Sequence, residues 1–379
     1  MKQVLSLILV AMPLAAIRKS MSLPNNETVD CVDVHRQHGS NVRLAEIPTA
    51  PTNAPPQATT AAPQLRQVYD TATDLCPEGT VPRRRVTLDD LRRFRNLDDF
   101  FRKVPSHIST SDLEAPPKEG PTADHQYARG YQYVDNWGIE AALNIWSPYV
   151  ELSSEFSLSQ IWAVRGGDGA PALKQTVEAG WQVSSSKYGD SNARLFVYFT
   201  TNNYGSSGGC YNLDCTGFVQ TSNLIMLGGS FATYSSHNGP QYELKLLLFK
   251  DLGNGSWWFR FGDTWLGYWP RELFNDGGLA DHAGKIAIGG EIVNGRSGGR
   301  HTATDMGSGW GPAYGFGNSA YERAIRYVQT GTAYAQDPSL TAQFDSADCY
   351  GLSAFAYSSD ASWGRYFYYG GGGYNANCE

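Results

Sequence analysis

The sequence Thr-Val-Glu-Ala-Gly-Trp-Gln-Val at residues 176–183 alternates apolar and polar side chains, as a half-buried β-strand does. Successive side chains of an extended chain point to opposite faces. The odd-numbered residues from Val177 to Val183 therefore face a hydrophobic layer. Glu178 and Gln182 are displayed on the opposite face, in a segment that carries no other charge.

A second stretch, Ile-Ala-Ile-Gly-Gly-Glu-Ile-Val-Asn at residues 286–294, has the same character. Its isoleucines take the apolar side, and Glu291 projects from the other side between small residues. The neighbouring glycines leave room for another backbone to approach. If Glu178 and Glu291 face each other, they form an acid–base pair. An ordinary solvent-facing glutamate on an amphipathic strand is the alternative for each of them.

Similar short β runs, separated by Gly, Asn, Asp and Ser, recur through the C-terminal two-thirds of the chain. They are predicted at 140–146, 156–165, 176–183, 195–200, 242–249, 257–261, 285–293 and 366–369. Short strands at this spacing, with turn residues between them, indicate an all-β sandwich or barrel. All ten Trp and 21 of the 22 Tyr lie after residue 120, so the aromatic core belongs to this region.

The N-terminal third has a different organisation. Residues 1–16, with Lys2 followed by an apolar run, are typical of a secretory signal peptide, so we expect secretion to the extracellular space, a cell wall or a digestive fluid. Residues 17–123 read as a prosegment that includes a disordered Pro/Thr-rich stretch at 48–64 and an exposed linker at 104–123. Thr87 is predicted to cap one short amphipathic helix ending near Lys103. The β domain then spans residues 124–379.

Charge and cysteine content narrow the function further. Residues 121–379 carry 15 basic and 23 acidic side chains, and this acidic balance disfavours nucleic-acid binding. No later segment is long and apolar enough for a membrane span. The six cysteines suit disulfides in an oxidising compartment, and we expect pairing within the groups Cys31 and Cys76, Cys210 and Cys215, and Cys349 and Cys378, although spacing alone does not determine this. Asn26 and Asn254 begin glycosylation sequons.

Other chemistries have weaker support. The seven histidines form no close ligand pair in the β domain, so no metal and no other cofactor are expected. The letters Gly-Arg-Ser-Gly-Gly at 295–299 fit a serine hydrolase motif, but no helix pattern follows them, as that motif requires. A glycosidase would also use two carboxylates. A non-catalytic β-sandwich that binds peptides or cell-wall carbohydrate is the main alternative to an enzyme.

Several long motifs in order resemble the neprosin family of secreted plant proteins. The resembling runs are Glu155-Phe-Ser-Leu-Ser-Gln-Ile-Trp, Glu178-Ala-Gly-Trp-Gln-Val, Cys210-Tyr-Asn-Leu, Gly289-Gly-Glu-Ile-Val-Asn, Met306-Gly-Ser-Gly and Trp363-Gly-Arg-Tyr-Phe-Tyr-Tyr-Gly-Gly. The runs Asp30-Cys-Val-Asp and Cys76-Pro-Glu-Gly-Thr-Val-Pro-Arg-Arg are similar to the activation peptide of that family.

The resemblance implies a glutamic endopeptidase on an antiparallel β-sandwich, made as a zymogen and cutting after proline. Its catalytic residues would be Glu178 and Glu291. The substrates would be proline-containing polypeptides, with Gln182, Gly290 and Tyr211 as candidate substrate contacts. Two close carboxyls share one proton, so activity is expected at acidic pH. The prosegment is expected to act as an intramolecular inhibitor, with the basic residues 83–85 facing the acidic domain.

Overall fold

The computed structural model describes residues 16–38, 42–51, 65–72, 75–103, 124–167, 173–205, 208–296, 300–332, 335–360 and 362–378. The predicted signal peptide up to residue 15, residues 52–64 of the Pro/Thr-rich stretch and the linker at 104–123 lie outside the described residues. Among those that are described, no helix has the length and apolar character needed to cross a bilayer.

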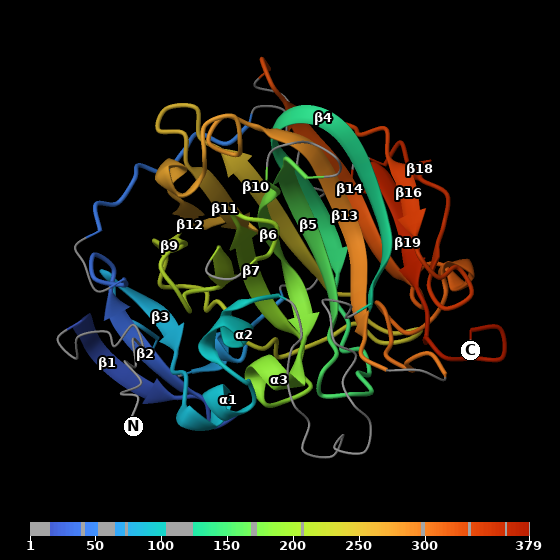
Figure 1. Ribbon diagram of the computed structural model, residues 1–379, viewed down its shortest axis with the longest axis horizontal. Coiled ribbons are helices and arrows are strands. Elements are labelled where there is room, and N and C mark those ends of the chain that lie inside the picture. The colour runs from blue at the N-terminus through green and yellow to red at the C-terminus, as the bar shows by residue number, and fades with distance from the viewer. Residues whose placement is uncertain are drawn as a thin grey trace, which may run out of the picture.

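The N-terminal part forms a small sheet of its own, coloured blue in Figure 1. Strands β1 (Ile17–Ser22), β2 (Thr28–Asp33) and β3 (Thr80–Arg84) pair antiparallel in that order. The disulfide Cys31–Cys76 ties β2 to the chain entering β3. This sheet therefore has its own covalent staple, separate from the large sheet.

A single helix was predicted after Thr87, and this prediction is wrong in extent. Two short helices are present, α1 (Leu88–Arg92) and α2 (Leu97–Phe101). The predicted capping box is confirmed, with Thr87 and Asp90 bonding each other's backbone N–H. The helix breaks because Asn96 starts a second one: its side chain accepts a hydrogen bond from Asp99 N at 2.9 Å.

The C-terminal part is a single strongly curled sheet. Its strands are β4 (Asp124–Asn144), β5 (Ser157–Arg165), β6 (Gln175–Val183), β7 (Arg194–Thr200), β8 (Gly209–Tyr211), β9 (Val219–Gln220), β10 (Glu243–Lys250), β11 (Trp257–Phe261), β12 (Thr264–Trp269) and β13 (Ala283–Asn294). They continue as β14 (Ala320–Gln329), β15 (Ala335–Gln336), β16 (Thr341–Phe344), β17 (Gly351–Leu352), β18 (Ala356–Tyr357) and β19 (Arg365–Gly370). The remaining helical segments are α3 (Ser185–Tyr188) and the 3-10 turns η2 (Tyr69–Thr71), η3 (Arg271–Leu273) and η4 (Pro312–Tyr314).

The long strand β4 belongs to both layers of the sheet. Its first half pairs with β13 and β16, and its second half, from Asn136 onward, pairs with β10 and β14. Figure 1 shows β4 arching over the molecule, so that one layer contains β8-β7-β6-β5-β13 and the other contains β10-β11-β12-β9. All pairings in the sheet are antiparallel. The predicted all-β antiparallel class is confirmed.

The hydrophobic core lies between these two layers. As predicted, Val177, Trp181 and Val183 of β6 and the isoleucines of β13 are fully buried in one cluster, which also contains Leu246 and Leu248 of β10. The opposite face of β6 and β13 therefore points away from this core and carries Glu178 and Glu291.

The expected disulfide pairing is confirmed for all six cysteines. Cys210 bonds Cys215, and Cys349 bonds Cys378, both within the C-terminal part. No disulfide joins the N-terminal part to the C-terminal part, because the third bridge closes before residue 77. Asn26 and Asn254 are both exposed.

Candidate active site

Strand register places the two glutamates diagonally across one strand. β5 lies between β6 and β13, and on β5 Trp162 is opposite Glu178 while Leu158 is opposite Glu291. Gln160 lies midway between these two positions and therefore points to the same face. Three strands thus bring two carboxylates and one carboxamide together away from the core.

Glycines opposite Gln160 make the space for this arrangement. Gly180 on β6 and Gly289 on β13 are its two cross-strand partners. A Cβ at Gly180 would lie 2.6 Å from the Gln160 Cβ, and Gly289 has a φ of +145° with the β4 backbone against it. Side chains at either position would displace the strands that hold the glutamates.

Lys103 links the two glutamates directly. Its Nζ lies 2.8 Å from Glu178 Oε2 and 2.8 Å from Glu291 Oε2, so these two oxygens approach a common point. All three side chains are almost completely buried. The ammonium also lies 5.3 Å from the centre of the Trp162 ring. A cation from the segment after α2 therefore bridges the two buried carboxylates, with one positive charge between two negative ones.

Glu178 is otherwise held by neutral donors. Thr176 Oγ1 and the Tyr204 hydroxyl donate to its Oε1 at 2.6 and 2.7 Å, and Gln160 Nε2 donates to its Oε2 at 2.9 Å. Together with Lys103, these bonds give both carboxylate oxygens two partners, which offsets the cost of burying the charge.

Glu291 has a second partner that can carry charge. His125 Nδ1 lies 2.6 Å from its Oε1, on the oxygen that Lys103 does not contact. Burial alone would raise the pKa of the Glu291 carboxyl, but the Lys103 ammonium and the His125 imidazole outweigh it and lower the pKa to about 2. Glu291 is therefore ionised across the ordinary pH range while Lys103 is in place.

The three residues expected to contact substrate lie at different distances from this centre. Gln182 is buried, and its Nε2 donates to the Tyr188 hydroxyl at 3.4 Å rather than to the carboxylates. A Cβ at Gly290 would meet Tyr369 and Met306 at 2.6 and 2.7 Å, so this position faces the core instead of the groove. A side chain at Gly290 would point to the core because this position alternates with Glu291 along β13, and a backbone contact between Gly290 and substrate stays a prediction.

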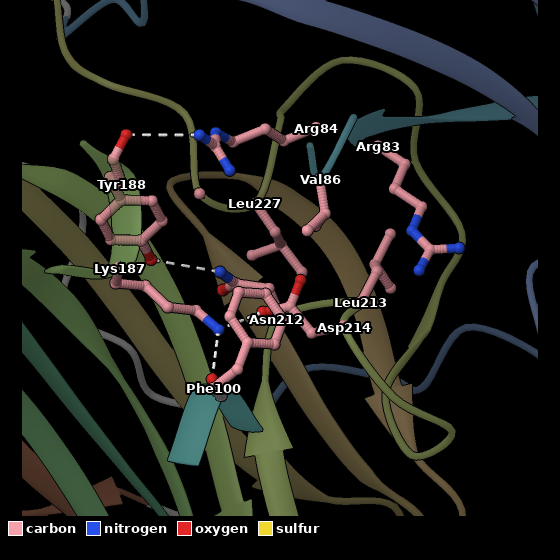
Figure 2. Close-up of a pocket in the computed structure, with 11 residues that line it drawn as sticks. Arg83, Arg84, Val86, Phe100, Lys187, Tyr188, Asn212, Leu213, Asp214 and Leu227 are labelled. Carbon is pink, nitrogen blue, oxygen red and sulfur yellow. Dashed lines mark hydrogen bonds and ion pairs between the residues drawn. The ribbon is translucent and has the colours of Figure 1, made fainter. Parts of the chain in front are cut away.

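Tyr211 lies on the glutamate-bearing face, in the region covered by the N-terminal part. Its ring packs edge-on against Tyr198 at 4.8 Å, and α2 lies over β8, which carries it. Figure 2 shows the adjoining pocket, where Lys187 Nζ bonds the Phe100 carbonyl at 2.7 Å and Asp214 at 2.7 Å. The chain from Phe100 to Lys103 thus covers the face that carries the carboxylates.

Arg84 and Arg85 make ion pairs within the N-terminal part, and Arg83 and Arg84 also contact the C-terminal part, near which they were expected. Arg84 pairs with Glu27 and Asp90, and Arg85 pairs with Asp30, all within the N-terminal part. Arg84 also donates to Tyr188 O at 3.3 Å, and the backbone of Arg83 forms an isolated parallel bridge with Leu227. In the reverse direction, Arg194 of β7 binds Glu27 of the N-terminal part at 2.8 Å.

Five residues that contact the glutamates escaped the sequence reasoning: Gln160, Lys103, His125, Thr176 and Tyr204. Gln160 could have been found, because the alternation along 157–165 places it with Trp162. Lys103 and His125 border the linker at 104–123, and sequence pattern gave no register for either. Tyr204 follows β7 in a turn, and its contact depends on the pairing of β6 with β7.

Comparisons with known proteins add the family. The solved structures similar to this chain include scytalido-glutamic peptidase with a peptide-based transition-state analogue, with 11% identity, 65% of this chain and 98% of that chain covered, and a TM-score of 0.33. Another is SCP-B, a member of the Eqolisin family of peptidases in complex with the tripeptide Ala-Ile-His, with 10% identity, the same coverage and a TM-score of 0.30. The Neprosin family model matches residues 153–372, which is more than half of the chain, and the protein therefore belongs to the Neprosin family.

Proposed function

We propose that the protein is a secreted glutamic endopeptidase, made as a zymogen, that hydrolyses peptide bonds after proline at acidic pH. The observation that carries the proposal is the convergence of Glu178 and Glu291 on the single point now occupied by Lys103 Nζ. Membership of the Neprosin family supports the peptidase class. The site brings two carboxylates together with hydrogen-bond donors around them, and such a pair can carry out acid–base hydrolysis.

Hydrolysis follows from placing a water where the ammonium now lies. One carboxylate takes a proton from the water while the water oxygen bonds to the scissile carbonyl carbon. The other carboxyl gives its proton to the carbonyl oxygen. One carboxyl thus gains a proton as the other loses one, and the total charge of the pair stays the same. When the C–N bond breaks, the first carboxyl protonates the leaving amine, and the second recovers a proton from the tetrahedral carbon's hydroxyl. The pair titrates together and is lost as pH rises.

The zymogen proposal assigns residues 1–16 to a signal peptide, 17–123 to the prosegment and 124–379 to the peptidase domain. It is supported by the position of β4, which begins at Asp124 and is integral to the large sheet. It is also supported by the contacts that seat the prosegment. Gln67 exchanges two hydrogen bonds of 2.8 Å with the Met226 backbone, and Arg93 donates to Ser186 O at 2.7 Å.

Inhibition by Lys103 would weaken in acid. In the docked state the pKa of Glu291 is about 2, below its ordinary value of 4.5. A carboxyl with a depressed pKa stabilises the docked state fully above its ordinary pKa and loses that contribution as pH falls toward the depressed value. Acid therefore loosens the prosegment between about pH 4.5 and pH 2. Asp90, whose burial is outweighed by Arg84 and the Thr87 N–H, has a pKa of about 2, below its ordinary value of 3.8, so acid also weakens its ion pair with Arg84 inside the N-terminal part.

Preference for proline rests on the motif resemblance and on the aromatic character of the groove. Trp162, Tyr198, Tyr204 and Tyr211 lie around the carboxylates, and their flat faces suit a rigid, apolar pyrrolidine ring. Exposed Asn26 and Asn254 are proposed glycosylation sites of the secreted chain.

The test is cleavage of quenched peptides that differ only by Pro or Ala before the scissile bond, from pH 2 to pH 8, after acid treatment of the full chain. Glu178→Gln and Glu291→Gln should each lower kcat by ~100- to 10,000-fold, the usual range for an acid–base group. Glu272→Gln, an exposed glutamate of η3, is the control and should retain full activity. Absence of cleavage by folded, processed wild type would favour a non-catalytic binding protein.

A further inference from the structure

His125 is the second residue of β4 and lies beside Glu291 through strand pairing. It is opposite Val293 on β13, so it shares a face with Glu291, which lies two residue pairs away along the two strands. The ring is held from two sides, by the edge of Phe156 at 5.8 Å and by a stacked Tyr127 at 6.5 Å. Its Nδ1 lies 2.6 Å from Glu291 Oε1. The imidazole is therefore fixed in place by packing, and it remains partly accessible to solvent.

The two carboxylates differ in the hydrogen-bond partners that remain when Lys103 leaves. Lys103 contacts Oε2 of both glutamates, whereas His125 contacts Oε1 of Glu291. Withdrawal of Lys103 leaves Glu291 with an imidazole that can be cationic. Glu178 is left with Thr176, Tyr204 and Gln160, which donate to it but carry no charge.

We propose that His125 is a positioning residue that, as an imidazolium, keeps Glu291 ionised, so that Glu291 is the general base and Glu178 the general acid. This rests on the proposed peptidase function. An opposite charge within hydrogen-bond distance favours the ionised carboxylate, and the single proton of the pair then resides on Glu178. The hydroxyls of Thr176 and Tyr204 can turn to accept from that proton, as hydroxyls both donate and accept.

The charged and titratable groups near His125 come mainly from β4 and β13, and one of them, Arg129 of β4, is a cation whose guanidinium lies 3.9 Å from the centre of the Tyr127 ring. Glu291 on β13 is the hydrogen-bond partner of His125, Phe156 before β5 is apolar, and Tyr127 on β4 has a pKa raised well above its usual value by burial, so it stays neutral. Glu178 adds a second negative charge when ionised. Lys103 places a positive charge beside Glu291 only while the N-terminal part is docked.

The proton path is complete with these assignments. Water gives a proton to Glu291 as its oxygen bonds to the carbonyl carbon, and Glu178 gives its proton to the carbonyl oxygen. On C–N cleavage the proton on Glu291 passes to the amine, and Glu178 regains a proton from the hydroxyl whose oxygen becomes the new carbonyl. His125 keeps its proton throughout and contributes only its charge and its hydrogen bond.

The experiment compares His125→Asn and His125→Lys with wild type, each as the full chain with the 104–123 segment cut by an added protease of another class. Asn keeps a neutral donor near Nδ1, and Lys restores a cation. The acid limb of the kcat–pH profile should move up by about one unit or more in the Asn variant, as expected on losing an opposite charge, with KM little changed. The Lys variant should move the limb back toward wild type. His282→Asn, which removes a surface imidazole paired with Asp135, is the matched control and should leave the profile unchanged.

An Asn variant that folds, as judged by its melting temperature, and keeps the wild-type acid limb would overturn the inference. A Lys variant that leaves the limb where Asn puts it would do the same, because a hydrogen bond or ring packing would then suffice as the explanation. Failure of the proposed function is a separate result: Glu178→Gln and Glu291→Gln would remain active. If those two are inactive while His125→Asn behaves as wild type, only the role of His125 is refuted.

Discussion

Replacing Lys103 with methionine would keep the length and apolar stem of this side chain and remove its charge. In the native site the ammonium bonds two buried carboxylates at 2.8 Å each. Without it, Glu178 and Glu291 would face each other beneath the N-terminal part with no ammonium between them, although their other hydrogen bonds would remain. Removing one partner of a buried ion pair costs ~3–5 kcal/mol. At ~1.4 kcal/mol per tenfold change, the segment from α2 to residue 103 would be released ~100- to several-thousand-fold more often at neutral pH.

The free-energy cost of removing the Lys103 charge should be largest near neutral pH and small in acid. In acid, one carboxyl of the variant can take up a proton, which relieves the repulsion, and in the wild type the ion pair between Glu291 and Lys103 weakens as the pH falls toward about 2. The two chains should therefore behave similarly in strong acid and differ most near neutrality.

The assay follows self-processing of the full chain on gels at intervals from pH 3 to pH 7, with quenched-peptide cleavage measured in parallel. Wild type should be processed only in acid, and Lys103→Met should begin processing at a higher pH. Lys245→Met, at an exposed lysine of β10, controls for the loss of a charge elsewhere. A Lys103→Met chain that stays latent over the same pH range as wild type would refute the view that this ammonium closes the site.

Two further substitutions test the surroundings of the carboxylates. Tyr204→Phe removes the donor 2.7 Å from Glu178, and since a hydrogen bond to a charged group contributes ~1.5–3 kcal/mol, kcat should fall ~10- to 100-fold with KM little altered. Tyr149→Phe, at an exposed tyrosine, should have no effect. Glu322 is fully buried and accepts from Ser159, and burial raises its pKa well above 4.5. Because the folded protein binds this proton more tightly, Glu322 stabilises the fold fully below pH 4.5, and this contribution is lost as the pH rises toward the native pKa. The melting temperature of the wild type should therefore fall from pH 4 to pH 8. It should fall less in Glu322→Gln. Equal slopes for both chains would count against a protonated Glu322.

Much of the fold followed from alternation along single strands. The period-two pattern at 176–183 and 286–294 correctly separated the core face from the face that carries the glutamates. It worked because each of these strands has one face against the core, so its side chains sort by polarity. The length of β4 was missed, since only its second half, near 140–146, has an apolar pattern. Residues 124–136 pair instead with β13 and β16 and carry mixed side chains.

The candidate site was predicted only in its two principal residues. Glu178 and Glu291 stood out because carboxylates are unusual among Gly, Trp and Ile. Their meeting depended on β5 lying between them with an offset of four residues, and strand order is a property of the whole sheet. Lys103 was assigned to a helix end, and its role depends on where two short helices place the chain rather than on any local pattern.

The separate staple of the N-terminal sheet has a consequence for how activation scales with amount. The Cys31–Cys76 disulfide lies before the 104–123 segment, and the other two disulfides lie after it. A cut in that segment therefore leaves two chains with no covalent bond between them. Before the cut, tethering keeps the inhibitor at an effective concentration on the order of millimolar. After the cut, rebinding of the N-terminal chain is bimolecular and depends on the protein concentration. If the N-terminal chain inhibits as proposed, dilution after acid treatment would favour its dissociation and complete activation. In a concentrated solution returned to neutral pH it would rebind, and activity would be lost again.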